Sequence, residues 1–416
     1  SIVHISDIHL SETGSPVVGR TDHLAAAICE AEMQCRNYII VLSGDVANQG
    51  SEAEYAVASS FLSGIKEAIK RNRPGSAVQF VSIPGNHDCV LPDSEVVLRG
   101  ALIDGLRSTL HTGKPDPMIM KMLLECQKHY FTFAKELFDY PLTDTERLCG
   151  SRLIDVPGGN LLFNLFNTAL LSRRNEQQGI MLPIEVMRST PEANHECSLS
   201  IAVFHHPYYW LEPNDGIEFR NHIDRTSDFA LTGHQHVEHG FLKQSLSGEI
   251  VFYSEGHVLQ EPGQPGVSAF RVIVLDLEHE TRRVLSYDWN GKQSIYSPVV
   301  ESDWTSYSRP HSRSVGISPS KNFLAKLSDS GIGLTHSIAG PLTLDTFFVC
   351  PDVSIRKVGS FDVARDLSGS LLFEYIASSS RIIIEGSAFA GKSALAQTLA
   401  KEWLRTRSYY PLLISG

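Results

Sequence analysis

The chain has 416 residues, of which 42% are hydrophobic and 20% are charged, a composition typical of a globular protein with about two or three domains. Its formal net charge of −11 argues against a protein that coats nucleic acid through bulk electrostatics. No apolar run approaches the roughly eighteen residues of a membrane span. The seven cysteines include no C-x-x-C pair, which favours a reducing, cytoplasmic location.

Short apolar runs alternate with helical patterns in the first part of the chain and are followed by hairpin-like strands. This order predicts a layered α/β protein with a mixed central sandwich. We expect strands at residues 2–6, 39–43, 79–83, 161–165, 199–204, 229–231, 250–253, 269–277 and 283–287, and helices at 23–35 and 51–71.

Five short polar motifs occur along the same part of the chain, and four of them directly follow a predicted strand. Their carboxylates, amide and imidazoles suit two divalent ions better than one structural zinc. Loops at the carboxyl ends of strands are where open α/β sheets place their ligands. The motifs are Asp7-Ile8-His9, Gly44-Asp45, Gly85-Asn86-His87-Asp88, His205-His206-Pro207 and Gly233-His234-Gln235-His236.

Residues 1–290 resemble the calcineurin-like metallophosphoesterases in these motifs and their order, except that Asn48 stands where the family often has Asp. The resemblance implies a four-layer αββα sandwich and two metal ions, which could be manganese, iron, zinc or nickel. It also implies that Asp45 bridges the ions and that His87 acts catalytically on the leaving oxygen. The implied ligands are Asp7, His9 and His236 for the first metal and Asn86, His205 and His234 for the second.

Residues 90–150 interrupt the strand–helix alternation with mainly helical patterns at 95–110 and 117–138. Because this insertion follows the Asn86-His87 motif, it could be a substrate-selecting cap, or it could be an outer helical layer that buries only its own apolar face. Candidate substrate contacts near the motifs are His206, Tyr208 and Arg99.

Residues 291–345 are rich in Ser, Gly and Pro and are predicted to be a linker with one short helix near residues 318–330. A second motif follows, in which a predicted strand at 381–385 leads into G-x-x-x-x-G-K-S and then a helix. Strand, glycine loop and helix N-terminus together are typical of a P-loop. The expected nucleotide-binding residues are Gly386, Gly391, Lys392 and Ser393, with Mg-ATP as ligand.

Residues 346–416 resemble the start of a NACHT-type domain of the signal-transduction ATPases with numerous domains (STAND). This resemblance implies a truncated ATP switch, with further sensor domains expected in a longer natural protein and oligomerisation on activation.

The expected function is therefore a dinuclear-metal phosphodiesterase acting on a nucleotide or nucleic acid under a STAND-type switch. By family analogy it is an antiphage effector. Two alternatives stay open, namely a phosphomonoesterase acting on protein or small metabolites and a non-enzymatic metal-binding scaffold.

Overall fold

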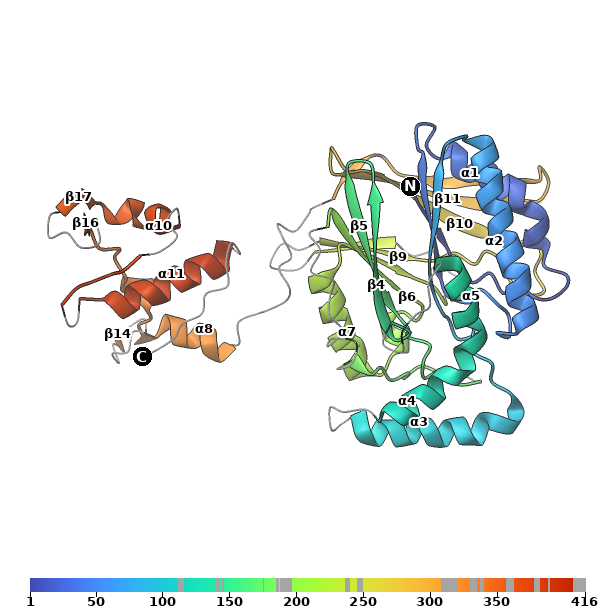
Figure 1. Cartoon of the computed structure of the whole chain (residues 1–416), viewed down its shortest axis with the longest axis horizontal. Helices are drawn as coiled ribbons and strands as arrows, with labels where there is room; N and C mark the ends of the chain where they lie inside the picture. Colours follow the sequence, from blue (N-terminus) through green and yellow to red (C-terminus); the bar gives the residue numbers. More distant parts are fainter. Residues whose placement is uncertain are drawn as a thin grey trace. The chain divides into compact units, whose positions relative to one another are not determined.

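The computed structural model divides the chain into two compact units, Ser1–Val315 and Gly316–Gly416 (Figure 1). No described helix is long and apolar enough to cross a membrane. The structure describes residues 1–110, 116–138, 143, 146–174, 176–184, 187, 197–235, 240–244, 250–307, 321–329, 335–336, 340–356, 363–377, 382–387 and 390–406.

The first unit contains a seven-stranded sheet in the order β12-β11-β10-β1-β2-β3, with β13 paired to β11. Strands β1, β2 and β3 run parallel, and every other pairing is antiparallel. The strands are β1 (Ile2–Ile5), β2 (Asn37–Ser43), β3 (Ala77–Ile83), β10 (Ala269–Asp276), β11 (Thr281–Asn290), β12 (Ile295–Glu301) and β13 (Thr305–Ser306).

A second sheet has six strands in the order β4-β5-β6-β7-β9-β8. Its four central strands run parallel, and β4 and β8 pair antiparallel at the two edges. The strands are β4 (Cys149–Val156), β5 (Gly159–Phe166), β6 (Leu199–Phe204), β7 (Phe229–Thr232), β8 (Gly240–Gln244) and β9 (Ile250–Glu255).

The two sheets pack face to face, and the period-2 alternation of each strand separates two cores. On β2, Ile39 and Val41 belong to one apolar cluster with residues of the second sheet, whereas Ile40 belongs to the outer cluster. Helices α1 (Thr21–Glu30) and α2 (Glu52–Asn72) pack in that outer cluster against the first sheet (Figure 1).

On the opposite side, helix α7 (Pro213–Thr226) places the Phe219 ring against Phe166 of β5 and Phe204 of β6. The described part of the first unit is therefore layered α-β-β-α, in agreement with the mixed α/β class expected from the sequence.

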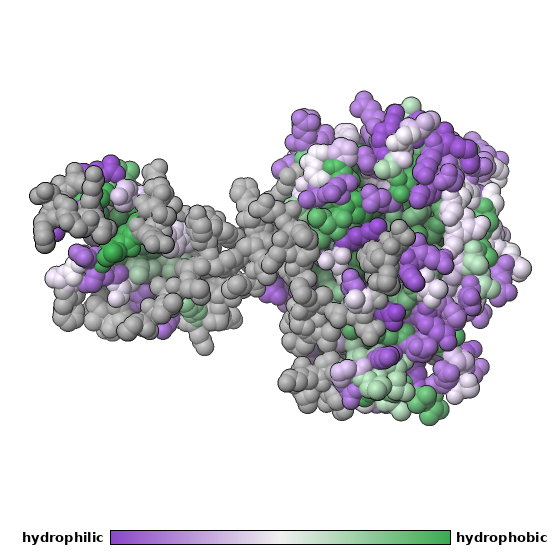
Figure 2. Space-filling view, in the orientation of Figure 1, coloured by the Kyte–Doolittle hydropathy of each residue, from purple (hydrophilic) through white to green (hydrophobic). Residues whose placement is uncertain are grey.

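The predicted insertion contains three helices, α3 (Val96–Leu110), α4 (Pro117–Leu124) and α5 (Lys128–Phe138), with a 3-10 turn η3 (Glu125–Gln127) between the last two. Its predicted end at residue 150 overlaps the start of β4. Several large apolar side chains of α3 and α4 are exposed, and the space-filling view shows hydrophobic colour at this end of the unit (Figure 2).

The predicted boundary at residue 290 is wrong, because β12 and β13 both pair with β11 beyond it. Strand β12 carries the proline and polar residues of an exposed edge strand, and only Tyr296 of its seven residues is buried. The sequence therefore lacks the apolar alternation that predicts a strand, and residues 295–306 were assigned to the linker.

The second unit has a small apolar core formed by Leu367, Leu372, Ile376, Leu395 and Leu399. Its described elements are α8 (Lys321–Ser328), β14 (Thr335–His336), β15 (Gly340–Pro341), α9 (Leu344–Phe347), β16 (Val353–Arg356), β17 (Val363–Leu367), α10 (Gly369–Ala377) and α11 (Lys392–Thr406).

The strand predicted at 381–385 is not formed in its described part, because residues 382–387 have no regular secondary structure. Ile383 is 74% exposed, and among the described residues no strand pairs with this segment. A β-branched run forms a strand only where another strand accepts its hydrogen bonds.

Candidate metal centre

Six of the seven predicted metal ligands lie in loops that follow strand ends, and the seventh, His236, lies outside the described residues. Parallel strands bring their carboxyl ends to one edge of a sheet, and here the corresponding edges of both sheets meet. The first sheet supplies Asp7 and His9 after β1, Asp45 after β2 and Asn86 after β3, while the second supplies His205 after β6 and His234 after β7.

Backbone strain is concentrated in these loops. Six described residues other than glycine have positive φ, a conformation that costs about 1–3 kcal/mol each and occurs preferentially at functional sites. Four of the six are predicted ligands, namely Asp7 (51°), His9 (46°), Asp45 (55°) and His234 (75°). The surrounding sheets hold these side chains in directions that an unstrained loop would not give.

Two glycines allow the loops to approach one another closely. A Cβ atom on Gly44, which has φ of +101°, would lie 2.4 Å from Nδ1 of His205. A Cβ atom on Gly85 would lie 2.2 Å from Oδ1 of Asp45. The glycines of the G-D and G-N-H-D motifs therefore make room for the ligands of neighbouring loops.

Four atoms that could bind a metal ion converge at this edge. We call them the donor cluster: Asp45 Oδ2, Asn86 Oδ1, His205 Nε2 and His234 Nδ1. His205 Nε2 lies 3.3 Å from the Asp45 atom and 3.0 Å from the Asn86 atom. His234 Nδ1 lies 3.1 Å from the Asn86 atom and 3.3 Å from His205 Nε2. Ligands bound about 2.1 Å from one metal ion lie about 3.0–3.4 Å from each other, so the cluster has the spacing of a coordination shell.

The hydrogen bonds of His205 fix which ring nitrogen faces the donor cluster. Its Nδ1 lies 2.8 Å from the carbonyl oxygen of Ser43, which only accepts, so Nδ1 carries a proton. Nε2 therefore faces the oxygen of Asn86, which also only accepts. These lone pairs repel each other unless a proton or a cation lies between them, and this orientation is typical of a metal-binding histidine.

A second group of donors surrounds the other side of Asp45. Ligand atoms of His9, Asp45 and His87 lie within 4.8 Å of one another, as do those of Asp7, Asp45 and His205. Asp45 thus belongs to both groups, as the predicted bridging role requires. Asp7 is oriented by two donors, the hydroxyl of Ser6 and the backbone N–H of His234.

The electrostatics of the donor cluster favour one positive charge beside the Asp45 carboxylate. Burial opposes protonation of His205, but the Asp45 carboxylate outweighs it and raises the pKa of His205 to about 10. Burial, together with the charges of His205 and His206, lowers the pKa of His234 to about 2. Without metal, a proton on His205 balances Asp45, and a divalent ion would displace that proton.

Asp88 positions two of the ligand loops, and the sequence analysis gave it no role. Its buried carboxylate accepts bonds from the backbone N–H groups of Ala47 (3.0 Å) and Gly85 (2.9 Å) and from the hydroxyl of Tyr55 (2.7 Å). Burial, followed by the charge of Asp45, raises the pKa of Asp88 to about 6. Its place as the last residue of the G-N-H-D motif was the available signal.

His87 lies beside the donor cluster with its side chain exposed to solvent. Its Nδ1 donates to the carbonyl oxygen of Asn48 (2.8 Å), which leaves Nε2 available to a ligand. Its backbone N–H donates to Oδ1 of Asp45 (2.8 Å). The imidazole is therefore fixed through Nδ1 and the backbone through Asp45, and Nε2 takes part in neither contact.

The structure gives His206 a structural position instead of the predicted substrate contact. The side chain is fully buried, with Nδ1 3.0 Å from the hydroxyl of Thr168 and Nε2 3.2 Å from Glu176. Both ring nitrogens are therefore engaged. Its ring lies 4.7 Å from that of His234, which it helps to position.

Tyr208 also points away from the site, because its ring packs against Phe204 and Phe219 in the core. Its neighbours in sequence take the predicted position instead. Trp210 contacts His234 edge to face at 4.2 Å, and Tyr209 is 51% exposed.

Arg99, the third predicted substrate contact, is 9% exposed and donates to three backbone carbonyls. The acceptors are Ser172 at 2.7 Å, Leu170 at 2.8 Å and Leu123 at 3.3 Å. An arginine with these partners holds the insertion to the loop after β5. The sequence shows an arginine but not its burial, and the substrate contact expected for Arg99 stays a prediction.

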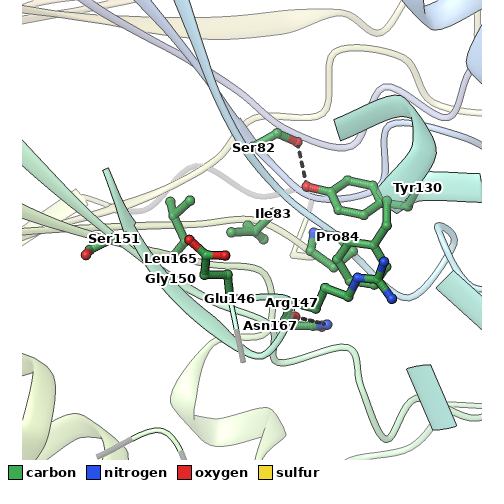
Figure 3. A pocket seen from close by; sticks show the side chains of 11 residues that line it. Ser82, Ile83, Pro84, Tyr130, Glu146, Arg147, Gly150, Ser151, Leu165 and Asn167 are labelled. Carbon is green, nitrogen blue, oxygen red and sulfur yellow. Dashed lines mark hydrogen bonds between the residues drawn. The ribbon is translucent and has the colours of Figure 1, made fainter. Parts of the chain in front are cut away.

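A small pocket at the base of the insertion shows how α5 is fastened to the first sheet (Figure 3). The hydroxyl of Tyr130 donates to that of Ser82 near the end of β3 (3.1 Å). Asn167 donates to the backbone oxygen of Arg147 across the same region (3.0 Å). None of the predicted metal ligands lines this pocket.

Comparison with known proteins places the first unit in a family. Residues 1–238 match the family described as calcineurin-like phosphoesterase. A comparison with curated proteins finds no match.

Solved structures similar to this chain include three with low sequence identity. Vps29 from Chaetomium thermophilum is 9% identical, with a TM-score of 0.30 over 74% of this chain and 98% of that chain. Zinc-bound Vps29 from Entamoeba histolytica is 8% identical, with a TM-score of 0.28 over 72% and 98%. A hypothetical protein from Thermus thermophilus is 11% identical, with a TM-score of 0.31 over 74% and 99%.

Proposed function

Because the chain belongs to the calcineurin-like phosphoesterase family, we propose that its first unit hydrolyses phosphoesters with two divalent metal ions. The observation that supports this most directly is the donor cluster. Lone-pair atoms of Asn86, His205 and His234 lie 3.0–3.3 Å apart at the edge where the two sheets meet. This is the spacing of ligands around one metal ion.

The donor cluster would hold one ion, and Asp7, His9 and Asp45 together with His236 would hold the other. When bound, such ions supply a hydroxide near neutral pH and neutralise the phosphoryl oxygens. The imidazole and carboxylate donors accept manganese, iron, zinc or nickel.

His87 supplies the proton that the leaving oxygen requires. The bond from Nδ1 to Asn48 fixes the plane of the ring, and the bond from its backbone N–H to Asp45 fixes its distance from the ligands. Because Nδ1–H donates to Asn48, Nε2 carries a proton only when the ring is an imidazolium; in that form Nε2 can donate to an alkoxide as it leaves, which is the role of a positioned general acid.

We further propose that the substrate is a phosphodiester of a nucleotide or nucleic acid. The Trp210 ring lies beside His234, the neighbouring Tyr209 is 51% exposed, and aromatic side chains offer faces on which a base stacks. Binding a base by stacking does not require a basic groove, which agrees with the net charge of −11.

The second unit is proposed to act as a STAND-type ATP switch over this enzyme, by family analogy in antiphage defence. In support, Lys392 at the start of α11 donates to the backbone oxygens of Gly386 (2.8 Å) and Ser387 (2.7 Å), and Gly391 has φ of +80°. The lysine thus folds back over its own glycine loop, where Mg-ATP phosphates and Ser393 would meet.

The function can be tested with purified protein reconstituted with manganese. We expect about two metal ions per chain by elemental analysis and faster hydrolysis of a bis-aryl phosphodiester than of an aryl phosphomonoester. Preference for the monoester would instead support a phosphomonoesterase. Two bound metals without hydrolysis of either ester would support a metal-binding scaffold, and fewer than two metals would contradict the dinuclear site.

A further inference from the structure

The His234 ring, which supplies Nδ1 to the donor cluster, packs against two other rings. The ring centroid of His206 lies 4.7 Å from that of His234, and the ring centroid of Trp210 lies 4.2 Å from it. The backbone of His234 has φ of 75°, a strained conformation that persists only where the surrounding structure fixes it. The contacts of His206 and Trp210 therefore help to set the direction in which the His234 donor atom points.

One stretch of the chain after β5 holds both of these neighbours. Its described residues are 167–174 and 176–180, and we call it the clamp segment. The backbone N–H groups of Gly179 (2.8 Å) and Ile180 (3.1 Å) donate to the carbonyl oxygen of Trp210. The clamp segment thus supports the surroundings of a ligand although it contains none of the predicted ligands.

Glu176 is the residue of the clamp segment that holds the His206 ring. Its side chain is 9% exposed, and Oε2 lies 3.2 Å from Nε2 of the fully buried His206. Because a carboxylate only accepts, Nε2 donates to it. On the other side of the ring, the hydroxyl of Thr168 lies 3.0 Å from Nδ1 and also accepts from the backbone N–H of His206 (3.0 Å).

Loss of the Glu176 carboxylate would leave the Nε2–H of His206 buried without this acceptor. A buried donor that loses its partner is costly, so we expect the ring to turn toward another acceptor. The His206 ring would then no longer pack against His234 as it does in the structure. The effect of Glu176 on the donor cluster therefore passes through two imidazole rings.

The ligands expected for the first metal ion are held by a different set of contacts. The backbone N–H of Asp7 donates to the oxygen of Gly44 (3.2 Å), and that of His9 donates to the oxygen of Asp45 (3.0 Å). These bonds join loops that follow strands of the first sheet. Removal of Glu176 should leave them in place, so its effect should fall on one ion.

We propose that Glu176 is a positioning residue for the second metal ion, which acts through His206 to hold His234 in the donor cluster. This inference rests on the dinuclear centre proposed above. Residues that support a ligand from outside the coordination shell typically change metal affinity by about ten- to a hundredfold. Glu176 thereby sets the affinity of the second ion separately from that of the first.

The test titrates the full, metal-free chain with Mn²⁺, followed by calorimetry and electron paramagnetic resonance. In Glu176→Ala, one ion should bind as in the parent and the other about ten- to a hundredfold more weakly. The resonance spectrum should then show an isolated ion where the parent shows a coupled pair. Glu176→Gln keeps an oxygen that accepts from Nε2 of His206 and should bind both ions nearly as the parent does. Gln177→Ala, at the exposed neighbouring residue, is the matched control.

Three results overturn the proposal: Glu176→Ala binds both ions as the parent does, it weakens both ions equally, or Glu176→Gln is as weak as Glu176→Ala. If Glu176→Ala does not fold, Glu176→Asp takes its place, because its carboxylate is one methylene too short to reach Nε2 of His206.

Nitrogen NMR of the metal-free, histidine-labelled chain gives a readout that needs no metal. The ring signals of His234 should shift in Glu176→Ala and stay in place in Gln177→Ala, and unshifted signals in folded Glu176→Ala overturn the proposed contact. A parent that binds both ions without hydrolysing phosphoesters contradicts the proposed function but leaves this inference standing. If the parent binds fewer than two ions, the dinuclear centre fails, and the His234 signals still decide whether Glu176 holds the ring.

Discussion

The two motifs proposed to bind phosphate groups are held in opposite ways. In the first unit, the carbonyl oxygen of Ser43, 162 residues away, orients the His205 ring. The backbone N–H of His234 donates to the carboxylate of Asp7, 227 residues away. In the second unit, the described bonds of Lys392 reach only five and six residues back along the chain. The first motif is thus fixed by the sheets around it, whereas the second is shaped mainly by its own loop.

This difference predicts where substitutions will have large effects. A site held by distant elements is preorganised, so removing one contact disturbs both chemistry and fold. A loop held by neighbours in sequence can change without consequences for the rest of the molecule.

The largest effect is expected for Asp45→Asn, because this carboxylate belongs to both groups of donors. Loss of an outer-shell partner alone reduces metal affinity about ten- to a hundredfold, so loss of the shared ligand should reduce metal content and turnover by more than about a hundredfold. Elemental analysis and phosphodiester hydrolysis measure both. The exposed Asp155, changed to Asn, is the control and should behave as the parent. Retention of two metals by the Asp45 variant would contradict the bridging role.

His87→Ala should separate chemistry from metal binding. We expect both metals to stay and turnover of an alkyl phosphodiester to fall about a hundredfold, because the leaving alkoxide needs a proton. An aryl leaving group needs none, so its rate should fall less. Comparing the two substrates on the same variant provides the internal control. Loss of metal, or an equal loss of rate on both substrates, would show that His87 is a ligand or a structural residue.

Asp88→Asn tests the contact that joins two ligand loops. An amide cannot accept from two backbone N–H groups and a tyrosine hydroxyl as the carboxylate does, so a buried donor is left without a partner. We expect the free energy of unfolding to fall by about 1–3 kcal/mol and metal affinity to fall with it. Asp93→Asn, at an exposed aspartate of the insertion, is the control. Unchanged urea unfolding would show that the loops are held by other contacts.

The buried His4 predicts how stability depends on pH. Burial, followed by the charges of Arg271 and His257, lowers the pKa of His4 to about 3. The unfolded chain binds this proton near pH 6.5 and the folded chain near pH 3, so stability is lost as pH falls through that interval, by up to about 1.4 kcal/mol per pH unit. Urea unfolding of parent and His4→Gln between about pH 4 and 7 measures it. An equal slope for both would assign the effect to other groups.

The smallest effect on the first unit is expected for Lys392→Ala. It should weaken ATP binding by at least about tenfold, because the lysine supplies charge to the terminal phosphates. Metal content should stay the same, and the free energy of unfolding of the first unit should change by less than about 0.5 kcal/mol. Isothermal titration with ATP, elemental analysis and urea unfolding check these expectations. A loss of metal would mean that the P-loop motif affects the metal centre, although the described hydrogen bonds of Lys392 stay within its own loop.

The sequence predicted the sheets well where strands are buried on both faces. Runs such as Ile39–Ser43 are continuous and β-branched because helices or the other sheet cover each side. It failed for β12, whose exposed edge carries a proline, and for the segment at 382–385, where an apolar run lacks a described partner strand. Strand identity there depends on neighbours that the local sequence does not contain.

The metal motifs were recognisable because their residue types are set by the chemistry of the ligands. The residues around them were not. The burial of Arg99 was not predictable, because it depends on a loop 73 residues away. Asp88 was overlooked because its partners, Ala47 and Tyr55, meet it only in the folded state.

The span of 227 residues between Asp7 and His234 also sets a delay during synthesis of the chain. At about 5–20 residues per second, roughly 10–45 s of synthesis separate the first ligand from the last in this pair. Until the second sheet is made, the early loops hold carboxylates and imidazoles in only half a coordination shell. A growing chain therefore presents only part of the proposed dinuclear site, and the proposed hydrolysis can begin only once both sheets have paired.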